Sequence, residues 1–125
     1  RRYQDAPRLP AQPARPATAE RLGVTLRDYG GDGPAIVFVP SLINPPNVLD
    51  LSPEASLLRW LAHQGFRVRL IDWGSPSAER RCLDVTGHVE QVLLPLLDTL
   101  DEPLVLAGYC LGGTLALASA ACRPV

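Results

Sequence analysis

The sequence predicts an α/β fold built on a mostly parallel sheet, and three observations lead to that fold class. Short apolar runs rich in β-branched residues alternate along the chain with segments whose leucines and valines recur at helical spacing. Some of the runs are continuously apolar, which is typical of parallel strands covered on both faces. The last run, residues 104–107, stops at a glycine and restarts as an Ala/Leu-rich segment. A strand that turns back through a helix has this pattern.

The length and composition allow one domain and exclude several classes of protein. The chain has 125 residues, of which 46% are hydrophobic and 20% charged, enough for one modest core. The net charge is -1 and the basic residues are all scattered arginines, so no basic patch for nucleic acid or an anionic membrane is evident. No apolar run approaches the roughly 20 residues that span a bilayer, and no secretory signal is evident. We therefore expect a cytoplasmic protein.

Residues 1–22 are predicted to be an extended arm rich in Pro, Ala and Arg, and residues 23–125 the domain proper. Prolines recur at every third position from Pro7 to Pro16, which is the repeat of a polyproline II helix. The arm contains a P-x-x-P sequence and could be a docking peptide. We favour the simpler interpretation of a compositional bias in a lead-in that lies on the surface.

The first two strands of the domain are predicted before and after a glycine-rich turn. Apolar and polar residues alternate over 24–29 until the run 30–34 breaks the pattern. Residues 35–39 are then continuously apolar, and Pro40 ends the strand. The loop 41–47 would cross the carboxyl edge of the sheet, where α/β folds place their chemistry.

Two helices and a further strand are predicted in the middle of the chain. Ser52 followed by proline is the pattern of a helix start, and Gly65 is placed as a C-terminal cap. Residues 66–71 alternate as a strand. Asp84 would cap the second helix, which Pro95 should bend or interrupt. The inward stripe of the first helix is predicted to be Leu57, Leu58, Leu61 and Ala62.

The turn after the last strand carries the candidate nucleophile. Cys110 stands between Gly108 and Gly112 in a G-x-C-x-G pattern, the cysteine form of the nucleophile elbow, in which small neighbours let a strained turn expose one side chain. The N-terminus of the following helix favours a thiolate, which is the reactive form. With this elbow, the sheet is assigned to the central part of an α/β-hydrolase fold. The alternative is that the glycines only allow close packing and that Cys110 is a small buried filler.

Acyl transfer by such an elbow needs two backbone N–H donors for the oxyanion. In this fold one donor is the residue after the nucleophile, here Leu111, and the other comes from the loop after the first central strand, here Ser41 or Leu42. The remaining two cysteines lack the spacing of a disulfide framework or a zinc site, so no metal is expected. Cys82 is interpreted as an incidental thiol and Cys122 as a small buried one.

The base and acid that should assist Cys110 are not evident. In the order typical of hydrolases both follow the nucleophile, and nothing suitable follows Cys110. His63 and His88 are expected to be ordinary surface histidines on helices. Asp72 is better placed at the carboxyl end of a strand, but an aspartate before Trp-Gly is also a common turn former, and we favour that interpretation.

Several linked motifs resemble those of the polyhydroxyalkanoate synthases, over about residues 35–118. They are N-P-P-N-V-L-D-L at 44–51, L-I-D-W-G at 70–74 and G-Y-C-L-G-G-T at 108–114, with Pro53, Ser56, Leu57, Arg59, Gly65 and Pro76 between them. The resemblance implies an acyltransferase that moves 3-hydroxyacyl groups from coenzyme A thioesters onto a growing polyester, with Cys110 carrying the chain. It implies no cofactor besides that substrate. It also implies a homodimer or a second synthase subunit as partner, and the surface of the polyester granule as an alternative location.

The sequence departs from the family in one respect. Family members have a catalytic aspartate and histidine in the C-terminal part of the domain, and that region is absent here, as are the strands after the elbow helix. Together with the absence of methionine, this predicts that the 125 residues are the N-terminal part of a longer catalytic domain, inactive alone, with an open edge at the elbow strand. Two other functions remain open: a thioesterase or esterase with a cysteine nucleophile, and a non-catalytic synthase-like scaffold.

Overall fold

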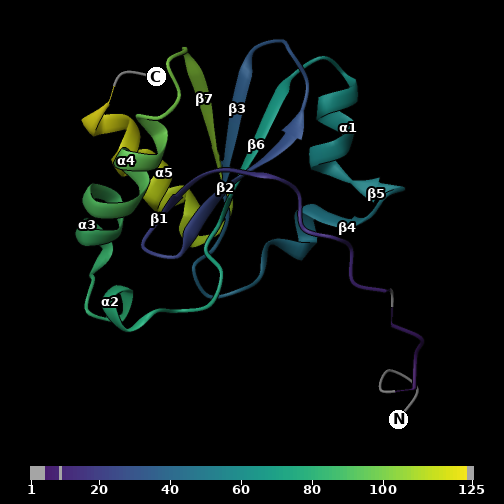
Figure 1. Cartoon of the computed structure of the whole chain (residues 1–125), viewed down its shortest axis with the longest axis horizontal. Coiled ribbons are helices and arrows are strands. Elements are labelled where there is room, and N and C mark those ends of the chain that lie inside the picture. The colour runs from purple at the N-terminus through teal and green to yellow at the C-terminus, as the bar shows by residue number, and fades with distance from the viewer. Residues whose placement is uncertain (1–4, 9, 124–125) are drawn as a thin grey trace.

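The structure is a computed structural model, and it describes residues 5–8 and 10–123 of the chain. A five-stranded sheet stands between helices on its two faces (Figure 1). The main elements are β1 (Ala17–Arg21), β2 (Val24–Gly30), β3 (Ala35–Val39), α1 (Leu57–His63), β6 (Arg67–Asp72), α2 (Ala78–Arg81), α3 (Val85–His88), α4 (Leu94–Leu97), β7 (Leu104–Gly108) and α5 (Leu111–Cys122). Smaller elements are a 3-10 turn (Pro46–Leu49), a hairpin of β4 (Asp50–Ser52) and β5 (Ala55–Ser56), and a π-helical turn (Val89–Leu93).

The strand order confirms the predicted fold class. The order is β1-β2-β6-β3-β7, in which β3 is parallel to both β6 and β7, and β2 is antiparallel to both β1 and β6. The neighbouring strands β6, β3 and β7 are therefore parallel, as the predicted fold class requires, and the β1–β2 hairpin adds antiparallel strands at one edge. The other edge of the described sheet is β7. Because β3, β6 and β7 are parallel, their carboxyl ends lie at the same edge of the sheet. The loops that follow these strands therefore lie close together at that edge.

Strand β1 lies inside the segment that the sequence predicts to be an arm. Its residues are exposed except Ala19, which is partly buried. The sequence of this strand therefore lacks the alternation of apolar and polar residues that would predict it. The arm before it also contacts the domain. The Arg15 guanidinium donates to the Tyr29 carbonyl oxygen at 3.3 Å and stacks 5.3 Å from the centre of the Tyr29 ring. Further on, the Asp28 N–H donates to the Pro16 carbonyl oxygen at 2.9 Å.

The first helix begins later than predicted. Residues after Ser52 complete the β4–β5 hairpin, and the Ser52 hydroxyl accepts the N–H of Ala55 at the start of β5 at 3.1 Å instead of capping a helix. Ser56 is the cap, and its hydroxyl accepts the Arg59 N–H at 3.1 Å. The predicted inward stripe changes accordingly: Leu58 is fully buried, whereas Leu57 is 46% exposed.

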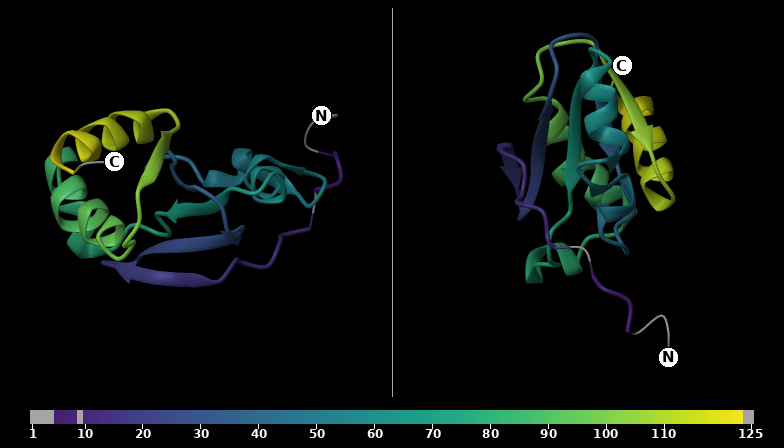
Figure 2. Two further views of the ribbon diagram at one scale, coloured as in Figure 1. Left: turned by 90° about the horizontal axis from the view of Figure 1, so that it is seen from above. Right: turned by 90° about the vertical axis from the view of Figure 1, so that its right-hand side faces the viewer.

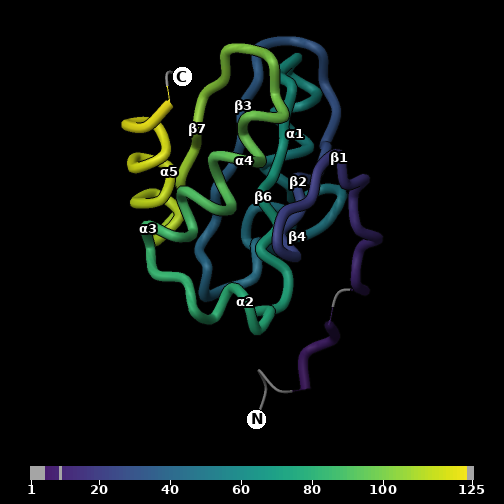
Figure 3. The backbone as a smooth tube through the Cα atoms, turned by 60° about the vertical axis from the view of Figure 1, so that its left-hand side comes forward, coloured from purple at the N-terminus to yellow at the C-terminus, as the bar shows by residue number. Residues whose placement is uncertain are grey.

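The second predicted helix is interrupted near Pro95, as expected. It runs through α3, the π-helical turn and α4 as one coil beside α5 (Figure 3). Proline has no N–H to donate to the carbonyl four residues earlier, which belongs to Gln91. The Arg21 side chain of β1 donates to that oxygen at 3.0 Å. The Arg21 side chain thus donates the hydrogen bond to the Gln91 carbonyl that Pro95 cannot donate, and it links β1 to the helix.

Different helices cover the two faces of the sheet (Figure 2). Beneath them, the two faces bury separate apolar clusters. One cluster lies under the π-helical turn, α4 and α5 and includes Val37 and Val39 of β3. The other lies under α1 and includes Phe38 of β3. Successive residues of β3 therefore point into opposite clusters, which agrees with the prediction that this strand is covered on both faces. Within the described residues, every helix is too short or too polar to cross a membrane.

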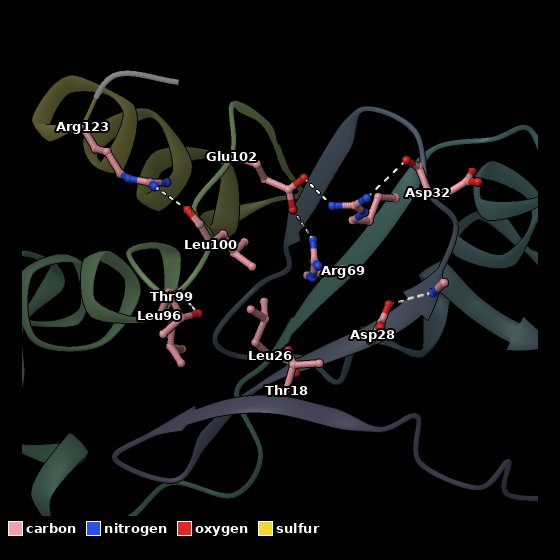
Figure 4. A network of polar contacts seen from close by, with 12 residues as sticks. Thr18, Leu26, Asp28, Asp32, Arg69, Leu96, Thr99, Leu100, Glu102 and Arg123 are labelled. Carbon is pink, nitrogen blue, oxygen red and sulfur yellow. Dashed lines mark hydrogen bonds and ion pairs between the residues drawn. The ribbon is translucent and has the colours of Figure 1, made fainter.

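An ion-pair cluster joins the amino ends of β6 and β7, at the edge away from the elbow. Glu102 accepts from Arg67 at 2.6 Å and from Arg69 at 3.0 Å. Arg67 also donates to the Asp32 carbonyl oxygen at 3.2 Å, and Figure 4 shows the contact of the Glu102 carboxylate with Arg69. Burial raises the pKa of Glu102, but the hydrogen bonds from the two arginines outweigh it, so the pKa lies below its ordinary value.

Helix α5 packs on the backbone of the sheet through two glycines. A Cβ atom on Gly112 would lie 1.9 Å from the Val39 carbonyl oxygen, and one on Gly108 would lie 2.4 Å from the Cα atom of Gly113. Neither position has room for a side chain. Gly113 differs, because the nearest atom to a Cβ there would be 3.9 Å away. The close approach therefore depends on Gly108 and Gly112.

This packing predicts opposite effects for two neighbouring substitutions. Gly112→Ala should lower the free energy of unfolding by about 3 kcal/mol, because the methyl group meets backbone that cannot move aside cheaply. Gly113→Ala is the matched control and should change it by less than about 1 kcal/mol, in the stabilising direction. Urea unfolding of the natural protein that carries these residues measures both. Equal losses for the two variants would contradict the packing described.

The Glu102 cluster predicts a pH dependence of stability. A carboxyl group whose pKa is lower in the folded state stabilises the fold above its unfolded pKa, and that contribution is lost as the pH falls through the folded value. Glu102→Gln should therefore lower the free energy of unfolding at pH 7, by less than about 1 kcal/mol for a partly exposed cluster. Urea unfolding at a series of pH values should show the difference disappear towards pH 3. A difference that stayed constant with pH would be inconsistent with this cluster.

Candidate active site

The turn between β7 and α5 has the geometry of a nucleophile elbow. Cys110 has φ 56° and ψ -130°, a conformation that costs a non-glycine residue on the order of 1–3 kcal/mol. Only Leu22 shares a positive φ among the described residues other than glycine. The Cys110 side chain is exposed. The alternative of a buried filler therefore does not describe this cysteine.

Backbone hydrogen bonds hold the strained turn from both sides. The Tyr109 N–H donates to the Val39 carbonyl oxygen at 3.0 Å, which extends the pairing of β7 with β3 up to the elbow. On the helix side, the Gly112 N–H donates to the Tyr109 carbonyl oxygen at 3.0 Å and the Gly113 N–H to that of Cys110 at 2.9 Å. These bonds leave the first N–H of α5, that of Leu111, without a hydrogen bond to any described residue.

The loop after β3 lies against the first turn of α5. A Cβ atom on Gly112 would be 2.5 Å from the Pro40 carbonyl oxygen and farther from its carbon, so this carbonyl points towards the helix. Because a trans peptide is planar, the Ser41 N–H in the same peptide points the opposite way. The Ser41 side chain is buried, and its hydroxyl accepts the Ile43 N–H at 3.2 Å. In the described part of the chain, the Leu42 N–H makes no hydrogen bond.

Of the two residues predicted for the second oxyanion donor, the geometry therefore favours Leu42 over Ser41. Neither N–H bonds to a described residue, but that of Ser41 points away from α5, and the Leu42 side chain packs against the core cluster beneath α5. Leu111 supplies the other free N–H at the start of the helix. Both roles stay predictions, but the arrangement brings together the elbow and the loop that the sequence assigns to one site.

The candidate partners of Cys110 lie elsewhere. The Asp72 carboxylate accepts the Gly74 N–H at 3.1 Å and the Arg27 side chain at 3.2 Å, so it serves the turn, as the sequence suggests. His63 is exposed at the end of α1. His88 is partly buried, with Nδ1 2.8 Å from the Asp84 carbonyl oxygen. No hydrogen bond among residues 5–8 and 10–123 joins either histidine to Cys110.

The remaining thiols form no further site. Cys82 and Cys122 are free and exposed, which corrects the expectation that Cys122 is buried. Helix α5 is apolar on all sides, and Leu117 in it is 74% exposed, so its sequence does not tell which face is inward. Within the described residues no group of His, Cys, Asp and Glu side chains is arranged to hold a metal ion.

Sequence reasoning missed two features beside the site. The Trp73 indole N–H donates to the Pro40 carbonyl oxygen at 2.9 Å in the interior. Near it, Asp50 accepts from Tyr29 at 2.8 Å and from Arg59 at 3.0 Å. Burial raises the pKa of Asp50, but hydrogen bonds from Arg59 and other neighbours hold it below its ordinary value. The signal in the sequence was that Asp50, Arg59 and Trp73 belong to the linked motifs, whereas Tyr29 and Pro40 do not.

A hollow of about 780 Å³ opens beside the loop that carries Leu42. Its walls are the arm around residues 10–15, the loop 42–47 and the loop 72–76, with Asp50 on one side. The hollow thus lies at the carboxyl edge of the sheet, where ligands of open α/β sheets bind. Cys110 is not part of its wall.

Comparison with solved structures gives the fold. Mouse alpha/beta hydrolase domain-containing protein 10 is 25% identical, with a TM-score of 0.61 over 81% of this chain and 40% of its own. A laboratory-evolved variant of potato epoxide hydrolase is 22% identical, with a TM-score of 0.61 over 82% of this chain and 33% of its own. A thioesterase domain from the curacin biosynthetic pathway is 28% identical, with a TM-score of 0.55 over 81% of this chain and 36% of its own.

Comparison with curated proteins gives the family, although no family model matches the chain. The poly(3-hydroxyalkanoate) polymerase subunit PhaC of Haloferax mediterranei is 38% identical over 94 residues, 71% of this chain. Its counterparts in Haloarcula marismortui and Cupriavidus necator are 33% and 31% identical over 79% and 70% of the chain. The chain spans only 19%, 22% and 16% of these three relatives. Over these residues it belongs to the polyhydroxyalkanoate synthase family, within the α/β-hydrolase superfamily.

Proposed function

We propose that these residues supply the nucleophile and the oxyanion donors of an acyltransferase that moves 3-hydroxyacyl groups from coenzyme A thioesters onto a growing polyhydroxyalkanoate. The observation that carries the proposal is Cys110, which is exposed at the start of α5 with φ 56°. A strained, exposed cysteine at a helix N-terminus is suited to covalent acyl transfer. The relatives, which are named as poly(3-hydroxyalkanoate) polymerases, support the substrate class.

The proposed reaction has two steps, and Cys110 is regenerated at the end. The Cys110 thiolate attacks the thioester carbon, the Sγ–C bond forms, the bond to the sulfur of coenzyme A breaks, and coenzyme A leaves with the proton that Cys110 gave up. A hydroxyl oxygen of a second hydroxyacyl group then attacks the acyl-cysteine. The ester C–O bond forms, the C–Sγ bond breaks and the hydroxyl proton returns to the thiol. Each step passes through a tetrahedral oxyanion.

The Leu111 N–H and the Leu42 N–H are the proposed donors to that oxyanion. Neither donates to another residue in the described part of the chain, so both remain available to a ligand. Donors fixed in advance at the place where negative charge develops are worth about 10²–10³-fold in kcat each. The close packing of Gly112 on Val39 and Pro40 keeps the loop and the helix together.

The general base and its orienting acid are proposed to lie outside these 125 residues, because neither histidine here bonds to the elbow in the described part. The segment alone should therefore have no turnover. A second synthase subunit or a second copy of the chain is the proposed partner. A cytoplasmic location or the granule surface fits the substrates, and no cofactor besides coenzyme A thioester is required by the proposed steps.

A thioesterase is the second candidate. The chain is 28% identical to a solved thioesterase domain over 81% of its length, with a TM-score of 0.55. In a thioesterase water would attack the acyl-cysteine, and the product would be a free hydroxy acid instead of a polymer. Incubation of the natural protein with 3-hydroxybutyryl-coenzyme A, followed by analysis for polyester against free acid, separates the two functions.

The acyl-cysteine proposal predicts the effect of removing one thiol. Cys110→Ala in the natural protein should lower the rate of coenzyme A release by about 10³-fold or more, because the nucleophile is lost. Cys82→Ala and Cys122→Ala remove thiols that are also exposed and should leave the rate unchanged. Release of coenzyme A is followed with a thiol reagent under multiple-turnover conditions. Activity that survives Cys110→Ala, or turnover by the 125-residue segment alone, would contradict the proposal.

A further inference from the structure

One buried hydrogen bond links the two loops that follow the central strands. Trp73 comes directly after β6 and Pro40 directly after β3, and these strands are parallel neighbours. The Trp73 Nε1–H donates to the Pro40 carbonyl oxygen at 2.9 Å. Trp73 is 4% exposed, so no water competes for this bond. An unpaired carbonyl at this depth would cost much of the desolvation free energy of the group.

The Pro40 carbonyl is held from two directions. The Trp73 indole binds it from the β6 side, and Gly112 in the first turn of α5 lies so close that a Cβ atom there would be 2.5 Å from the oxygen. The peptide that contains this carbonyl is planar, so its orientation also sets the direction of the Ser41 N–H. The next peptide carries the N–H of Leu42. The bond thus fixes the backbone one residue before the proposed oxyanion donor.

The indole itself is fixed by its surroundings. Its ring belongs to the apolar core beneath the π-helical turn, α4 and α5. The His88 ring packs against it edge to face, with ring centres 6.0 Å apart. A donor on a buried, closely packed ring holds its acceptor more firmly in position than a donor on a loop does.

We infer that Trp73 is a positioning residue for the oxyanion-binding loop, acting through Pro40 on the N–H of Leu42. The inference rests on the proposed acyl transfer by Cys110. Trp73 touches neither the substrate nor the nucleophile in this role. It keeps the loop in the orientation that leaves the Leu42 N–H free to meet the negative oxygen of the tetrahedral intermediate.

Trp73→Phe tests the inference in the natural protein, because it keeps an aromatic ring and removes the N–H. The value of kcat for coenzyme A release should fall about 10- to 100-fold, since a misplaced oxyanion donor stabilises the transition state poorly. KM should stay within about twofold, because the interaction is made in the transition state. Trp60→Phe is the matched control: it makes the same substitution at a tryptophan that is 57% exposed on α1 and whose indole N–H bonds to no described residue, and it should leave kcat near the wild-type value.

A second measurement distinguishes a loss of oxyanion stabilisation from a change in the accessibility of the Cys110 thiol. Iodoacetamide alkylates Cys110 by displacing iodide at a saturated carbon, and no oxyanion forms. Acylation by a thioester does form one. Trp73→Phe should therefore slow single-turnover acylation of Cys110 about 10-fold or more and leave the alkylation rate within about twofold. A purely structural role would change both rates together.

A variant with 3-benzothienylalanine at position 73 guards against a folding defect, because sulfur replaces the N–H within a ring of the same shape. It should reproduce the loss of acylation. If Cys110→Ala keeps its turnover, the proposed function itself fails. If Cys110 is essential but both variants at position 73 acylate at the wild-type rate, or lose acylation and alkylation equally, the positioning role alone is overturned.

Discussion

The site depends on how closely helix α5 approaches the end of β3. The first turn of α5 meets the Val39 and Pro40 carbonyls with no side chain between them, because Gly112 has none. The chain must then reverse between the end of β7 and this turn within two residues. Cys110 takes φ 56° to do so, and the cost of that conformation is offset by the packing around it. The exposed thiol is therefore a consequence of backbone packing rather than of the cysteine itself.

The same approach organises the other half of the site. The Pro40 carbonyl turns towards α5 and receives the Trp73 indole N–H, and the peptide plane sends the Ser41 N–H the other way. The N–H groups of Ser41 and Leu42 both lack a hydrogen bond in the described structure, and Leu42 is then the candidate donor because the Ser41 N–H points away from α5. The end of β3 thus contacts both halves of the site: α5 with the nucleophile turn packs against it, and the candidate oxyanion loop begins there. Trp73, a residue of the linked motifs, thus has a physical role, which is to hold the Pro40 carbonyl in place.

Much of the fold could be predicted from the sequence where local signals were strong. The strand at 35–39 is apolar throughout, and the carboxylate of Asp84 caps its helix by accepting the Gly87 N–H at 2.7 Å, as expected. Strand β1 could not be predicted, because an exposed edge strand buries too little to show a pattern. Ser52 and Ser56 offer equal capping hydroxyls, and only tertiary packing of the β4–β5 hairpin decides between them.

The elbow was predictable for a similar reason, because its glycines and cysteine are adjacent in the sequence. The Trp73–Pro40 bond was not, since it joins residues 33 positions apart and no local pattern marks it. The choice of Leu42 over Ser41 also needed the direction of one carbonyl. Sequence reasoning thus finds residues that act within a turn, whereas residues that act across neighbouring strands need the structure.

The most direct test of the central claim is to locate the acyl group on the protein. The natural protein is mixed with 3-hydroxybutyryl-coenzyme A, quenched in acid, digested and mapped by mass spectrometry. We expect a 3-hydroxybutyryl thioester on the peptide that carries Cys110 and none on those of Cys82 and Cys122, although all three thiols are exposed. An acyl group found on another residue during turnover, with Cys110 unmodified, would contradict it.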